Sequence, residues 1–82
     1  MITTVELTLY PLQDEYLPVI KQFIEHLHSY EGIQLQTVPT CTIMMGEHDL
    51  IFDVLKTATR WSKEHQGKVV FVSKILPGYE AL

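Results

Sequence analysis

The sequence predicts an α+β fold whose elements follow the order β-α-β-β-α-β. Three observations predict it. Alternation of apolar and polar residues marks strands, and two stretches of helical spacing mark helices. The strand patterns occur once before, twice between and once after the two helices. At 82 residues the chain has the length of one domain, so we expect residues 1–82 to fold as a single unit.

The first half of the chain predicts a strand followed by a helix. Apolar and polar residues alternate from Ile2 to Tyr10, and Pro11 ends this pattern. Apolar residues then recur at helical spacing, which predicts a helix from about residue 15 to residue 30. Asp14 is the expected N-cap, and Gly32 suits the position just beyond the helix.

The second half predicts a hairpin, a second helix and a last strand. Strands over 33–38 and 40–45 are joined by a connection short enough for a hairpin. A broad apolar stripe predicts a helix from about Asp49 to His65. The apolar run over 69–72 predicts the last strand, and Pro77 falls in a turn that leads into a short tail.

This order of elements is that of the ferredoxin-like fold, a four-stranded antiparallel sheet with both helices on one face. The first and third strands are then the central neighbours. We call the face away from the helices the open face. We expect it to carry the polar sides of these two strands: Glu6, Thr8, Tyr10, Thr40, Thr42 and Met44. Cys41 would then point into the core, together with Ile43 and Met45.

Composition excludes several classes of function. A net charge of -4 disfavours nucleic-acid binding, which needs a basic surface. No apolar run approaches the roughly 20 residues that cross a bilayer, so we expect no membrane insertion. The N-terminal residues show no secretory signal pattern. Cys41 is the single cysteine, so no intrachain disulfide can form, and we expect a cytoplasmic protein.

Small size and a partly apolar open face favour assembly into a homodimer or homotetramer. The contact surface is expected on the strands. The backs of the helices carry charged residues instead: Lys21, Glu25, Lys56 and Arg60.

The sequence contains no catalytic or metal-binding signature. It has no glycine-rich phosphate loop, no paired cysteines and no HExxH, so we expect no enzyme activity and no cofactor. Two carboxylate positions remain open to two interpretations. Glu6 in mid-strand makes either a cross-strand contact or a ligand contact. Glu47 and Asp49 either complement the start of the second helix or join three nearby threonines in a ligand site.

Three segments resemble a known family. VELTLYPL at 5–12, LQTVPTCTIMMGEHDLIFDVL at 35–55 and KVVFVSKI at 68–75 resemble the YkoF-like thiamine-binding proteins, which are small ferredoxin-like domains. The resemblance implies binding of thiamine, or of its hydroxymethylpyrimidine part, without chemical turnover. It also implies assembly into dimers or tetramers.

The chemistry of that ligand suits particular residues. The amino group and ring nitrogens of an aminopyrimidine match a carboxylate and hydroxyls, its flat ring matches aromatic and thioether groups, and a thiazolium cation matches acids. The candidate ligand-binding residues are therefore Glu6, Thr8, Tyr10, Thr37, Thr42, Met44, Glu47, Asp49 and Phe52.

We therefore expect a non-enzymatic, cytosolic carrier or sensor in thiamine uptake or salvage. Two alternatives stay open. One is a ferredoxin-like oligomeric enzyme acting on a small molecule in a sheet-lined cavity, with Glu6 or His48 as base. The other is an assembly or regulatory module without a ligand.

Overall fold

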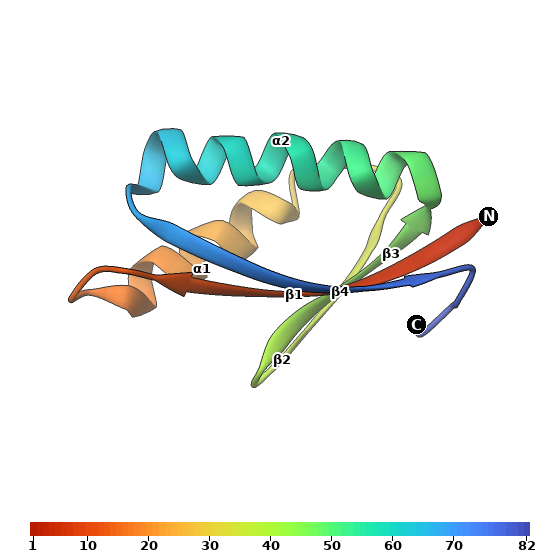
Figure 1. Cartoon of the computed structure of the whole chain (residues 1–82), viewed down its shortest axis with the longest axis horizontal. Coiled ribbons are helices and arrows are strands. Elements are labelled where there is room, and N and C mark those ends of the chain that lie inside the picture. Colours follow the sequence, from red (N-terminus) through yellow and green to blue (C-terminus); the bar gives the residue numbers. More distant parts are fainter.

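The computed structural model describes residues 1–82 and contains six elements in the predicted order (Figure 1). They are β1 (Ile2–Pro11), α1 (Tyr16–Leu27), β2 (Gln34–Val38), β3 (Cys41–Glu47), α2 (His48–Gln66) and β4 (Val69–Pro77). The strands form one antiparallel sheet in the order β2-β3-β1-β4. Both helices pack on one face of it. The predicted ferredoxin-like fold, with β1 and β3 in the centre, is confirmed.

Two boundaries differ from the sequence-based prediction for physical reasons. The sequence predicts β4 over 69–72, but the strand continues to Pro77, because it pairs with β1 along nearly the whole length of β1. It is an edge strand, and such a strand tolerates polar residues such as Lys74. At the start of α1 the N-cap position is Glu15, whose side chain makes no capping hydrogen bond. The expected Asp14 cap is therefore wrong.

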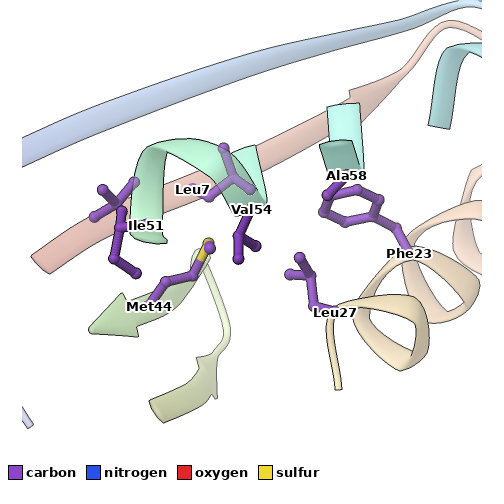
Figure 2. Close-up of a cluster of buried hydrophobic side chains, with 8 residues drawn as sticks. Leu7, Phe23, Leu27, Met44, Ile51, Val54 and Ala58 are labelled. Atoms are coloured by element: carbon purple, nitrogen blue, oxygen red, sulfur yellow. The ribbon is translucent and has the colours of Figure 1, made fainter. Parts of the chain in front are cut away.

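The core lies between the sheet and the two helices (Figure 2). Each helix has one apolar side, and neither is both long enough and apolar enough to cross a membrane. The sheet contributes its central strands and the helices their facing stripes. The buried cluster consists of Val5, Leu7, Phe23, Leu27, Met44, Ile51, Val54 and Ala58.

The predicted faces of β3 are wrong. In an antiparallel sheet, residues directly opposite one another share a face. Met44 lies opposite Val5, and Thr42 lies opposite Leu7, so both face the helices. Met44 is fully buried among core side chains (Figure 2). Cys41 consequently belongs to the open face and is only partly buried, rather than filling the core.

Gly46 explains why this side of β3 faces the helices. A Cβ atom at Gly46 would lie 3.2 Å from Cγ2 of Ile33 and 3.5 Å from Cδ1 of Ile51, in the layer between sheet and helix. The chain therefore needs glycine at a position that faces the helices. Because side chains alternate along a strand, Met44 and Thr42 must face the same way.

The chain after β4 folds back onto the open face. The Thr4 hydroxyl donates a hydrogen bond to the Tyr79 carbonyl oxygen and accepts one from the Ala81 amide at 3.1 Å. Met45, on the same face, is only 4% exposed. In Figure 1 the C-terminus lies on the side of the sheet opposite α2. The open face is thus covered near Thr4 and uncovered towards Tyr10, which is 54% exposed.

Candidate ligand-binding site

A cavity of about 710 Å³ opens where β1 ends and the β2–β3 hairpin turns. α1 forms one wall, and β1 and the hairpin form the others. Its volume falls within the range of roughly 300–1,000 Å³ that is usual for small-molecule sites. The lining residues are Leu7, Thr8, Leu9, Tyr10, Pro11, Tyr16, Ile20, Phe23, Ile24, Thr37, Val38, Pro39, Thr40, Cys41 and Thr42.

The cavity exists because β1 extends beyond its neighbour β3. Pairing between the two strands ends at Leu7 opposite Thr42, whereas β1 continues to Pro11 and there pairs only with β4. One edge of β1 is therefore unpaired from Thr8 onwards. Backbone N–H and C=O groups on such an edge can bond to a ligand.

Thr42 lies at the floor of this cavity. Its side chain is directed to the helix face and is only 6% exposed. Its hydroxyl makes no hydrogen bond within the protein, yet it is not sealed off from solvent, because no fully buried polar atom lacks a partner. Thr37 lies opposite it on β2. An unused hydroxyl in so confined a position is available to a ligand.

The cavity is mostly apolar and carries no charged side chain. None of its 15 lining residues is acidic, basic or a histidine. Its polar side chains are hydroxyls of threonine and tyrosine and the thiol of Cys41. One hydroxyl is already used, because Thr8 donates to the Thr40 carbonyl oxygen at 3.1 Å. The site therefore offers hydrogen bonds and apolar walls, and no counter-ion.

Four of the nine candidate residues line the cavity: Thr8, Tyr10, Thr37 and Thr42. The candidates from the sequence missed the wall that α1 contributes, including Tyr16 and Phe23. Their helical spacing signalled a core-facing stripe. That spacing alone could not reveal that the stripe also borders the gap beside β1 where β3 has ended.

Glu47, Asp49 and Phe52 lie at the opposite end of β3, where α2 begins. The expectation that the threonines and the acidic start of the second helix share one site is wrong. Thr42 and Glu47 are five residues apart on an extended strand, which separates them by roughly 16 Å. Met44 lies between them and is buried in the core.

At that far end, Glu47 and His48 already have partners, whereas the exposed Asp49 carboxylate has none. The Glu47 carboxylate accepts hydrogen bonds from the amides of Asp49 at 2.8 Å and Leu50 at 3.2 Å, and so caps α2. The His48 ring is hydrogen-bonded to the Thr3 hydroxyl at 2.8 Å and packs edge-on against Phe52. These contacts give Glu47 and His48 a structural role at the start of α2.

Glu6 also lies outside the cavity. It is directly opposite Ile43 on one side and Lys74 on the other, so it belongs to the open face. The expectation that it sits beside Thr42 is wrong, because Leu7 occupies that position. A ligand role for the Glu6 carboxylate stays a prediction.

A separate aromatic cluster joins the outer surfaces of the two helices. The His26 ring stacks on Trp61 with 3.7 Å between ring centroids, and its Nε2 is hydrogen-bonded to the Tyr30 hydroxyl at 2.9 Å. His65 donates from Nδ1 to the Trp61 carbonyl oxygen. Burial lowers the pKa of His26, and nearby His65 lowers it further. Burial raises the pKa of Tyr30. The cluster lies outside the cavity, and no group of three metal-ligating side chains occurs in the structure.

Fold and site together define a ferredoxin-like protein with an uncharged, hydroxyl-lined cavity at one end of its sheet. The chain belongs to the YKOF-related family, whose model matches residues 2–76. None of the curated proteins matches the sequence.

Two solved structures are similar over nearly the whole chain. A protein of Streptococcus pneumoniae is 27% identical with a TM-score of 0.86, and the match covers 96% of this chain and 89% of that one. A protein of Thermotoga maritima is 26% identical with a TM-score of 0.83, and the match covers 99% of this chain and 86% of that one. The latter is described as a candidate thiamine biosynthesis or salvage protein.

Proposed function

We propose that the protein binds thiamine, or its hydroxymethylpyrimidine part, in the cavity and releases it chemically unchanged, as a cytoplasmic carrier or sensor. Membership of the YKOF-related family and the description of the Thermotoga maritima relative support a thiamine-related role. The observation that carries the choice of site is the unpartnered Thr42 hydroxyl at the floor of an otherwise largely apolar cavity.

The cavity matches an aminopyrimidine group by group. A hydroxyl both donates and accepts, so Thr42 and Thr37 can bond to a ring nitrogen and to the exocyclic amino group. The unpaired edge of β1 adds backbone groups beside them. The wall of α1, including Tyr16 and Ile20, supplies a surface for the flat ring. A thiazolium ring attached to the pyrimidine would lie against the tyrosine rings of the lining, Tyr10 and Tyr16, because an aromatic face attracts a cation.

Titration calorimetry with the full chain tests this function. Thiamine and hydroxymethylpyrimidine should each give saturable heat, and an unrelated organic cation should give none. Mass spectrometry of the released compound separates a binding protein from an enzyme. Recovery of the unaltered compound fits a carrier or sensor. Conversion of the compound would favour the enzyme, and absence of binding would favour an assembly module.

We propose further that two copies associate through the uncovered part of the open face. Large apolar side chains lie exposed there, with Val72 at 53% and Val70 at 44%. Glu6 and Lys74 lie opposite each other in mid-sheet without an ion pair between them. A twofold axis that passes between Glu6 and Lys74 would bring the carboxylate of each copy to the ammonium of the other.

Sedimentation velocity tests the assembly. The parent protein should sediment as a dimer or larger species at micromolar concentration. Val72→Glu should give a folded monomer, because it buries an unpaired charge in the contact. Arg60→Glu, on the back of α2, is the matched control and should leave the assembly unchanged. A monomeric parent protein would contradict this proposal.

A further inference from the structure

The cavity has no charged side chain, and this affects which chemical form of the ligand it can bind. Thiamine and its pyrimidine part also occur as phosphate esters, which share the same ring and differ by a strongly charged group. A site that binds phosphate tightly presents arginine or lysine side chains, or free backbone N–H groups at a helix N-terminus. The cavity lacks the first of these, and the helix beside it is a poor source of the second.

No cation is present in the cavity. None of its lining residues is lysine, arginine or histidine. The whole chain carries ten acidic against six basic residues, so its long-range field also repels anions. A phosphate that entered would lose hydrating water and gain no counter-ion, which is unfavourable for any charged group.

The helix N-terminus beside the cavity does not replace a cation. α1 begins at Tyr16, which lines the cavity. The two residues before it, Asp14 and Glu15, are acidic, and their charges already complement the positive end of the helix dipole. Pro18 in the first turn has no N–H, so one of the usual anion-binding donors is missing.

We propose, on the basis of the proposed function, that the cavity selects the unphosphorylated ligand and rejects its phosphate esters. The Thr42 hydroxyl hydrogen-bonds to the pyrimidine ring, and the lack of a cation in the lining disfavours binding of the phosphate. The protein therefore acts before any phosphoryl-transfer step on this ligand. A kinase that adds phosphate to the ligand would also prevent it from binding again.

Calorimetric titration of the full chain with matched pairs tests this selectivity. The pairs are hydroxymethylpyrimidine with its monophosphate, and thiamine with its monophosphate and diphosphate. We expect each phosphate ester to bind at least about tenfold more weakly than its parent compound. High salt screens the long-range repulsion but leaves the missing counter-ion unchanged. The preference should therefore persist at high ionic strength.

A lysine placed in the lining should reverse the preference. Thr40 lies at the hairpin turn and has an exposed side chain, so Thr40→Lys adds a cation at the rim without disturbing the core. It should raise the affinity for hydroxymethylpyrimidine monophosphate relative to that for the parent compound, so the ratio of the two affinities is the quantity to measure. Gln36→Lys makes the same charge change on the open face and is the matched control. It should change neither affinity.

The outcomes separate the two proposals. Equal or tighter binding of the phosphate esters would overturn the selectivity and leave the proposed function standing. A preference that disappears at high ionic strength would also overturn it, because the net charge alone would then produce the preference. If no compound of either kind binds, the proposed function fails and the selectivity fails with it.

Discussion

The two ends of β3 differ in how their polar side chains are used. At the start of α2, Thr3 bonds to His48 and Glu47 caps the helix, so the polar groups there stabilise the fold. At the other end, Thr42 and Thr37 face a cavity and bond to nothing. Polar residues at both ends look alike in the sequence. Only their partners tell a structural group from one that is free to bind a ligand.

The largest expected effect tests which face of β3 is buried. Met44→Ala should lower the free energy of unfolding by about 2–5 kcal/mol, because it leaves a cavity in the core. Cys41→Ala, on the open face, should cost about 1 kcal/mol or less and leave ligand binding intact. Urea denaturation measures both. A larger loss for Cys41→Ala than for Met44→Ala would contradict the register of β3.

The next effect compares two threonines of nearly equal burial at the two ends. Thr42→Val keeps the shape and removes the unpartnered hydroxyl, so it should weaken ligand binding about three- to tenfold with no loss of stability. Thr3→Val removes the hydroxyl that is bonded to His48, so it should cost about 1 kcal/mol of stability and leave binding unchanged. Calorimetry measures binding and thermal unfolding measures stability. If Thr3→Val weakened binding and Thr42→Val lowered stability, the assignment of the two ends would be contradicted.

Much of this fold is predictable from the sequence, because its signals are local. Alternation in β1 and helical spacing in α2 are properties of short segments, and the element order then restricts the topology. The orientation of β3 is harder, since Cys41, Ile43 and Met45 are a more apolar set than Thr42, Met44 and Gly46, which face the helices. Gly46 carries the deciding signal, but its meaning depends on a helix packed against it.

The site is only partly predictable for a related reason. Thr37 and Thr42 are candidates because hydroxyls at strand ends suit a heterocycle, and both line the cavity. Glu47 and Asp49 follow closely in sequence, but an extended strand carries them to the far end of the sheet. The contribution of α1 to the cavity depends on how far β1 extends beyond the end of its pairing with β3. This is a property of the strand register and not of any sequence motif.

The aromatic cluster of His26 and Trp61 lies between the two helices, away from both ends of β3, and it gives a prediction about pH. The pKa of His26 is lowered in the folded protein, so folding favours its neutral form. This stabilisation is fully present above the unfolded pKa of about 6.5 and is lost as the pH falls below it towards the lowered pKa. Denaturation at several pH values should show the loss, and His26→Phe, which keeps a ring against Trp61, should reduce it. Identical pH profiles for parent and variant would contradict this assignment.

The smallest expected effect concerns Glu6. The sequence alone predicts that Glu6→Gln weakens binding roughly ten- to a hundredfold, as for a charged hydrogen-bond partner. Because Glu6 lies outside the cavity, the structure lowers this expectation to less than about a twofold change. Any effect should fall on assembly, through the pairing of Glu6 with Lys74 of a second copy. A tenfold loss of affinity in calorimetry would restore the carboxylate to the binding site.

The central claim is that the ligand binds where β1 extends beyond β3 and not at the start of α2. Titration of ¹⁵N-labelled protein with hydroxymethylpyrimidine, followed by amide chemical shifts, tests it directly. We predict that the largest shifts fall on residues 8–10 and 37–42 and on the first turns of α1. Largest shifts over residues 46–52, with residues 37–42 unchanged, would contradict it.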